Sequence, residues 1–245
     1  KVKELESLFK DYFDITYAVA SNSATSSLHS ALISIGVGPS DEVIVPAVSM
    51  SASATSILMA GAKPVFVDIN NGRCTNCHCN IDDINNRGCF NMNTDLIEKI
   101  ITEKTKAIMV VHLFGKSADM EKILQLAKKY NLKIIEDCAQ SPGTIYNDKL
   151  VGTIGDIGIF SFNQSKTISA GEGGVAITND DKYALRMQLM RNHAEAMIES
   201  FPEAEMPNLI GYNYRITDLE AAVAVEQFKR LNQFNNKKIK LANQL

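Results

Sequence analysis

The chain has 245 residues, of which 45% are hydrophobic, and it carries a formal net charge of −3 at pH 7. This composition can form a sizeable buried core, and the acidic balance without a clustered basic stretch disfavours a nucleic-acid-binding surface. The longest apolar runs, such as residues 107–111, are far too short to span a bilayer, and the N-terminus lacks the residue order of a signal peptide. We therefore expect a cytoplasmic protein with no nucleic-acid partner and no membrane partner.

Short β-branched runs alternate with helical patterns along most of the chain. This alternation predicts an α/β fold with a mainly parallel sheet that is covered by helices on both faces. The expected strands are residues 17–20, 43–46, 64–68, 107–112, 132–136, 157–162 and 174–178.

Two of the expected helices have an apolar stripe that indicates a buried side. The helix at residues 119–130 reads as a crossover between strands, and the helix that starts at Thr217 can be capped by Thr217 and Asp218. The first stripe contains Ile123, Leu124, Leu126 and Ala127, and the second contains Leu219, Ala222, Val223, Val225 and Phe228.

The strand at residues 17–20 is followed by Ser23, Ala24 and Thr25, which open a helix. Free backbone N–H groups and hydroxyl groups at a helix N-terminus can bind a phosphate. A plain serine-rich helix cap would produce the same pattern, so both interpretations stay open.

A short apolar run that starts at Lys133 ends in two carboxylates, Glu136 and Asp137, where a buried parallel strand would end. Ligands of open α/β sheets bind at such strand ends. A carboxylate there can hold a pyridine nitrogen protonated, as pyridoxal phosphate requires, although Asp137 could equally cap a following helix.

Lys166 lies among small residues between two apolar runs, in the sequence from Ser161 to Gly174. A lysine in a dry pocket loses its charge more readily and can attack an aldehyde, whereas most loop lysines are merely solvated. The helix start, Asp137 and Lys166 together supply a phosphate site, a ring-nitrogen partner and an aldehyde-trapping amine. That is the set of groups that binds pyridoxal phosphate.

The chain resembles the sugar aminotransferases of the DegT/DnrJ/EryC1/StrS family, from about Leu5 to about Leu231. The motifs that carry this resemblance are Ser23–Thr25, Asp41–Pro46, Gly61–Asp68, Val111–Gly115, Glu136–Gln140, Gly155–Phe162, Gly171–Gly174 and Gly211–Arg215. The resemblance implies the large domain of the fold-type-I pyridoxal-phosphate transferases. It also implies that most of the small C-terminal domain is missing, with residues 1–16 as an N-terminal helix, 17–232 as the cofactor-binding large domain and 233–245 as the start of a truncated segment.

Carried over by position, the resemblance implies that Lys166 binds the cofactor covalently, that Asp137 pairs with the pyridine nitrogen and that Gln140 lies near the ring hydroxyl. Where the family usually has an aromatic residue stacked on the ring, this chain has Met50, whose thioether can also pack on a π face.

The phosphate group would contact Ala24, Thr25 and Ser161, according to the same resemblance. Asn213 would reach the phosphate bound by the neighbouring subunit, which implies a homodimer with shared active sites. Arg215 would contact substrate or the partner subunit, although a surface ion pair is equally compatible with its position.

The implied reaction is a transfer of an amino group from glutamate or glutamine to a keto-sugar attached to a nucleotide, in polysaccharide or secondary-metabolite sugar biosynthesis. Three alternatives stay open: a sugar dehydratase, which in some relatives has histidine in place of the lysine; another fold-type-I reaction such as a desulfurase or aldolase; and a non-catalytic relative that binds a sugar or a protein.

Cysteine and histidine patterns give weaker indications. Cys74, Cys77, Cys79 and Cys89, around His78, could hold a structural metal, but reduced thiols on a surface loop are favoured, and no catalytic metal site is expected. His112 could line the site, although a satisfied structural histidine is favoured. His193 is expected near the entrance of the site.

Overall fold

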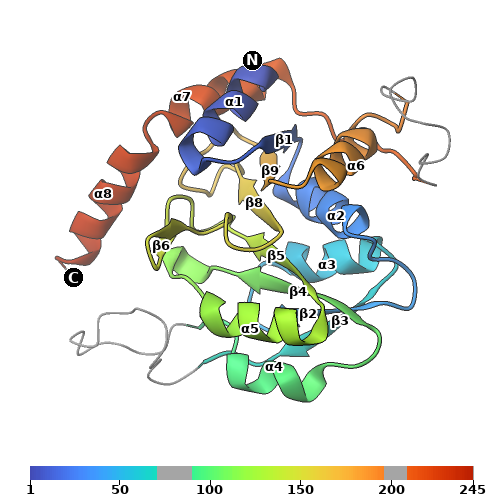
Figure 1. Ribbon diagram of the computed structural model, residues 1–245. Coiled ribbons are helices and arrows are strands. Elements are labelled where there is room, and N and C mark those ends of the chain that lie inside the picture. The colour runs from blue at the N-terminus through green and yellow to red at the C-terminus, as the bar shows by residue number, and fades with distance from the viewer. Residues whose placement is uncertain (71–89, 196–208, 245) are drawn as a thin grey trace.

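The computed structural model describes residues 1–70, 90–195 and 209–244. A sheet of seven strands lies at its centre, in the order β1-β9-β8-β5-β4-β2-β3 (Figure 1). All the strands expected from the sequence are present. They are β1 (Tyr17–Ser21), β2 (Glu42–Pro46), β3 (Lys63–Val67), β4 (Thr105–Val111), β5 (Lys133–Asp137), β8 (Ile157–Ser161) and β9 (Gly174–Thr178).

The sheet is mainly parallel, as predicted. Strands β3, β2, β4, β5 and β8 pair in parallel, and β9 alone runs antiparallel to both of its neighbours, β8 and β1. A separate hairpin of β6 (Ile145–Tyr146) and β7 (Lys149–Leu150) was not predicted, because strands of two residues are too short to show an alternating pattern.

Helices cover both faces of the sheet, which confirms the predicted layers (Figure 1). Neighbouring side chains of one strand point to opposite faces and pack in different cores. Ile134 of β5 belongs to the first core, and Ile135 belongs to the second. The first core includes side chains of α1 (Val2–Phe13), α4 (Thr94–Ile100), α5 (Met120–Tyr130) and α7 (Asp218–Phe228), and the second includes those of α2 (Ala24–Ser34), α3 (Ser51–Met59) and α6 (Asp181–Arg191).

An aromatic cluster ties the N-terminal helix to the end of α7. The ring of Phe9 stacks on Phe228 with centroids 4.2 Å apart, and it contacts Phe160 and Phe162 edge-on. Such pairs contribute about 0.5–1.5 kcal/mol each beyond the area they bury. Beyond α7, the helix α8 (Leu231–Ala242) extends away from the sheet (Figure 1). The proposed division at residues 16 and 232 stays a prediction.

Three members of the predicted apolar stripes are exposed, so the stripes were partly wrong. Leu124 is 40% exposed, Leu219 82% and Val223 48%. The buried residues instead keep helical spacing of three or four: Met120, Ile123 and Ala127 in α5, and Ala221, Ala224, Val225 and Phe228 in α7. The predicted cap at Thr217 is confirmed as a capping box with Glu220.

None of the helices in the described part of the chain is long and apolar enough to cross a bilayer.

Candidate active site

Asp137 ends β5 at the C-terminal edge of the parallel strands, and only 5% of its surface is exposed. Its Oδ2 accepts a hydrogen bond from Ser53 Oγ at 2.9 Å, and its Oδ1 accepts one from the Ala139 N–H at 3.1 Å. Burial raises the pKa of the Asp137 carboxyl group, and the two donors and the charge of Lys166 partly oppose that rise. A buried carboxylate of this kind favours a cationic N–H partner.

The helix-cap interpretation of Asp137 is wrong. Turns, not a helix, follow β5 directly, and the bond to Ala139 closes the first of them.

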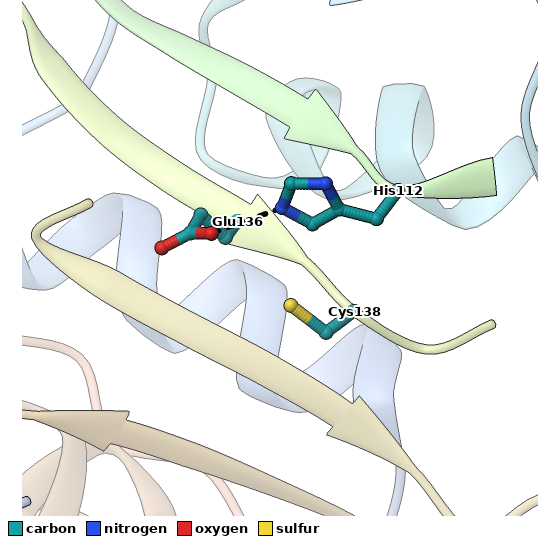
Figure 2. A group of neighbouring side chains, drawn as sticks. All are labelled: His112, Glu136 and Cys138. Atoms are coloured by element: carbon teal, nitrogen blue, oxygen red, sulfur yellow. Dashed lines mark hydrogen bonds and ion pairs between the residues drawn. The ribbon is translucent and has the colours of Figure 1, made fainter. Parts of the chain in front are cut away.

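Three buried side chains gather at the ends of β4 and β5 (Figure 2). His112 follows β4, and Glu136 and Cys138 flank Asp137 in sequence. Their potential ligand atoms are all within 4.8 Å of one another, which is compatible with a metal site. The hydrogen bonds favour another role. Glu136 accepts from His112 Nε2 at 2.9 Å and also from the backbone N–H groups of Gly152, Ile154 and Gly155.

His112 is fixed in one tautomer by its two partners. Nδ1 accepts from the Ala118 N–H at 3.1 Å, so Nε2 carries the hydrogen that points to Glu136. The lone pairs that would bind a metal are therefore already engaged, and His112 is the satisfied structural histidine that the sequence favoured. Burial and the neighbouring carboxylates raise the pKa of the Cys138 thiol well above its ordinary value, so this cysteine is a core residue.

Lys166 lies in the loop between β8 and β9, and its side chain is half-buried. Within the described part of the chain, no hydrogen bond or ion pair of its ammonium group is found. A pocket of about 890 Å³ is lined by Lys166 and Gln140 together with Phe114, and by Asn235 and Lys238 of α8. This size suits a ligand much larger than an ion. The pocket brings the predicted lysine to the same end of the sheet as Asp137.

The start of α2 meets the ends of β8 and β9 in a tight cluster. Ser161 pairs with Gly174, and a Cβ atom added at Gly174 would lie 2.6 Å from the backbone nitrogen of Ala24. Ser23 caps the helix by accepting from the Ser26 N–H, so the serine-cap interpretation is correct. The Ser23 side chain does not accept from the N–H groups of Ala24 and Thr25, for which the described residues provide no acceptor. The start of α2, where a phosphate was predicted to bind, therefore lies beside the strand pair that carries Ser161.

Asn213 lies beside the start of α2, where its carbonyl oxygen accepts a hydrogen bond from the Asn22 side chain at 3.3 Å. The residues on either side of it hold the segment against the core. Tyr212 and Tyr214 stack with centroids 4.9 Å apart, and Tyr214 Oη lies 3.0 Å from Nδ1 of the buried His29. The Asn213 backbone bridges to Asn192, while its side chain is exposed. This arrangement is compatible with the predicted contact to a neighbouring subunit.

Of the two residues predicted to contact the cofactor ring, Gln140 lines the pocket and Met50 does not. Met50 is the N-cap of α3 and 63% exposed, one helical turn before Ser53 and hence on the same helix face. Gln140 Oε1 accepts from the Phe114 N–H at 3.3 Å. Arg215 and His193 are exposed, and no ion pair of Arg215 is found among the described residues. The cysteines at 74, 77, 79 and 89 lie outside the described residues.

The sequence did not indicate Ser53, which donates to Asp137, or Glu136, which accepts from His112, as parts of the site. Ser53 has no distinguishing signal, because Ser51, Thr55 and Ser56 surround it in the same helix. Glu136 is adjacent to Asp137, and the sequence alone gave no means of separating a supporting carboxylate from one that faces a ligand.

Comparison with known proteins gives relatives whose sequences are similar along most of the chain. GDP-perosamine synthase from Caulobacter vibrioides is 39% identical over 232 residues, covering 95% of this chain and 57% of that protein. L-glutamine:2-deoxy-scyllo-inosose aminotransferase from Streptomyces kanamyceticus is 38% identical over 233 residues, covering 93% and 51%. The chain thus spans little more than half the length of these relatives.

The crystal structure of NtdA from Bacillus subtilis, with the bound cofactor PMP, has a TM-score of 0.79 and 31% identity, covering 94% of this chain and 48% of that one. The model of the DegT/DnrJ/EryC1/StrS aminotransferase family matches residues 1–245. Because the family model matches its whole length, the chain belongs to the DegT/DnrJ/EryC1/StrS aminotransferase family.

Proposed function

We propose that this protein is a pyridoxal-phosphate-dependent aminotransferase that moves an amino group from glutamate or glutamine to a keto-sugar carried by a nucleotide. The observation that carries the proposal is that Lys166 and the buried Asp137 carboxylate lie at the same end of the sheet. The lysine amine lies in a pocket at the strand ends, near enough for its charge to act on the buried carboxylate.

The residues present fit the cofactor by their chemistry. Asp137 is a buried carboxylate with one hydrogen-bond donor on each oxygen, which leaves a lone pair on each for a protonated ring nitrogen. The close approach of Gly174 to Ala24 brings Ser161 beside the unbonded N–H groups that start α2. These are the donors that a phosphate requires.

Bound pyridoxal phosphate supplies an electron sink for a carbanion at the donor's α-carbon. Lys166 would bond covalently to the aldehyde carbon and, once displaced by the amino donor, would move a proton from that α-carbon. Asp137 would keep the ring nitrogen protonated, Ala24, Thr25 and Ser161 would bind the phosphate, and Gln140 and Met50 would contact the ring hydroxyl and the ring face.

The proposal includes a cytoplasmic homodimer in which Asn213 of one subunit completes the site of the other. The exposed Asn213 side chain on an anchored segment supports this. The names of the two relatives support the substrates: one is named for a GDP-linked sugar, and the other for glutamine and a cyclic ketone.

Borohydride trapping tests the proposal, because reduction fixes the cofactor to the lysine that holds it. The complete protein, loaded with pyridoxal phosphate, should yield one adduct, on Lys166. Lys238 lines the same pocket, and its Nζ donates to Thr167, so Lys238→Ala is the matched control and should keep the adduct. Lys166→Ala should lose both the adduct and amine transfer.

An adduct on a lysine other than Lys166, or amine transfer by Lys166→Ala, would contradict the assignment. A protein that traps the cofactor but releases deoxygenated sugar without amine transfer would be a dehydratase, and cleavage of the amino acid would indicate a desulfurase or aldolase. A protein that binds sugar but no cofactor would be a non-catalytic relative.

A further inference from the structure

Ser53 of helix α3 forms a hydrogen bond with Asp137 at the end of strand β5. It lies in the first turn of α3, with 1% of its surface exposed, and its Oγ donates to Asp137 Oδ2 at 2.9 Å. The bond joins residues 84 positions apart in sequence, so it depends on how α3 packs against β5. The described residues give Oδ2 no other donor.

Ser49 extends this contact into a chain of two hydroxyl groups. Its Oγ lies 2.8 Å from Ser53 Oγ, and it is half-buried at the end of the loop before α3. A hydroxyl has one hydrogen to donate, and that of Ser53 is engaged by Asp137. Ser49 must therefore donate to Ser53, and each bond polarises the next in the direction of the carboxylate.

Asp137 needs this support because its burial opposes ionisation. Burial is the largest cause of its raised pKa, and the bond from Ser53 acts in the opposite direction. A hydrogen bond to the charged form of an acid favours that form. Without Ser53, Oδ2 would be buried with no donor among the described residues, which strengthens its attraction for a proton.

We propose that Ser53 is a positioning residue for the cofactor ring: with Ser49 behind it, it orients the Asp137 carboxyl group and keeps it ionised, so that the ring nitrogen retains its proton. The inference rests on the proposed function, because it assigns Ser53 a role toward pyridoxal phosphate. It extends that function to two residues that contact neither the aldehyde nor the phosphate.

The protonation of the ring nitrogen is the direct readout. The complete protein is loaded with pyridoxal phosphate labelled with ¹⁵N in the ring, and the ¹⁵N chemical shift is measured together with the dissociation constant of the cofactor. Ser53→Ala should move the signal toward that of an unprotonated pyridine, because the proton passes to the carboxylate. It should also weaken cofactor binding about tenfold, which corresponds to about 1.4 kcal/mol.

Ser56→Ala is the matched control. Ser56 is fully buried one turn further along α3, and its Oγ donates to the Ser53 carbonyl rather than to Asp137. It should leave the ¹⁵N signal and the dissociation constant unchanged. Ser53→Thr keeps the hydroxyl and should restore the wild-type signal, while Ser49→Ala, which removes only the outer donor, should shift it less than Ser53→Ala. If Ser53→Ala does not fold, Ser53→Cys takes its place with the same expected result.

Wild-type signals and affinity in a folded Ser53→Ala protein would overturn the inference and leave the proposed function standing. So would an equal effect of Ser56→Ala, since that would reflect packing of α3 rather than a bond to Asp137. If the unaltered protein binds no pyridoxal phosphate, the proposed function is wrong and the inference with it.

Discussion

His112 Nε2 donates to Glu136 Oε2 across 2.9 Å, with both side chains fully buried (Figure 2). This bond joins the end of β4 to β5, one residue before Asp137. The other bonds of Glu136 tie the loop at residues 152–155 to the same strand. The carboxylate that we assign to the ring nitrogen therefore projects from a strand that is held on both sides.

Glu136→Gln should lower the free energy of unfolding by about 3 kcal/mol. The amide nitrogen of glutamine is a donor and would face the N–H groups that the carboxylate now accepts, so buried donors lose their partners. Urea unfolding measures the loss. Glu226→Gln is the control, because the described residues give Glu226 only an exposed ion pair, with Lys229, which contributes at most about 1 kcal/mol. Similar losses in the two variants would show that the Glu136 bonds contribute little.

Gly174→Ala should weaken the binding of pyridoxal phosphate at least tenfold. The added Cβ would lie 2.6 Å from the Ala24 nitrogen, and this contact is with backbone, so the start of α2 must move away from Ser161. The dissociation constant of the cofactor can be measured by fluorescence titration.

Gly38→Ala is the control for this substitution. A Cβ at Gly38 would have no atom within 4 Å, and its φ is not positive, so affinity should stay unchanged. Unaltered affinity in Gly174→Ala would exclude the start of α2 as the phosphate site.

His29 should make the protein less stable in mild acid. Burial lowers the pKa of His29 below its ordinary value of about 6.5. As the pH falls through that value, the unfolded chain takes up a proton that the folded chain does not. The free energy of unfolding then decreases by up to about 1.4 kcal/mol per pH unit. The contribution is complete above the ordinary pKa and is lost below it.

Urea unfolding at pH 7.5 and pH 5.5 tests this effect. His29→Gln should decrease the difference in stability between the two pH values, whereas the same substitution at the exposed His193 should not. An equal decrease in both variants would show that the burial of His29 does not cause the pH dependence of stability.

The fold could be predicted from the sequence because most strands of its sheet are buried on both faces, with β3 at the edge as the partly exposed one. Such strands are continuous apolar runs, like Ile134 and Ile135, and each run could be placed within two residues of its observed ends. The helix stripes were less reliable. Leu124 lies one position from Ile123, and a shift of one residue rotates a side chain by about 100° out of the core.

The site was predicted in part, since only some of its groups leave a local pattern. Lys166 and Asp137 stand out at the ends of apolar runs. The Ser53 bond to Asp137 joins distant segments, and the four bonds to Glu136 depend mainly on backbone N–H groups, which any residue supplies. Such long-range and backbone contacts have no sequence signature of their own.

A shared active site should be demonstrable with mixed dimers of two inactive variants. In the proposed homodimer, Asn213 of one subunit contacts the phosphate that Lys166 of the other subunit helps to bind. Asn213→Ala should weaken cofactor retention in both sites, and Lys166→Ala should abolish amine transfer. A mixed dimer of these two variants has one site with both substitutions and one site with neither, so it should recover about one working site per dimer. Size-exclusion chromatography with two affinity tags isolates the mixed dimer, and each parent dimer alone is the inactive reference. Since Asn213 is exposed on an anchored segment, its loss should leave the folding of each subunit unchanged. A stable mixed dimer without recovered amine transfer would show that each subunit completes its own site.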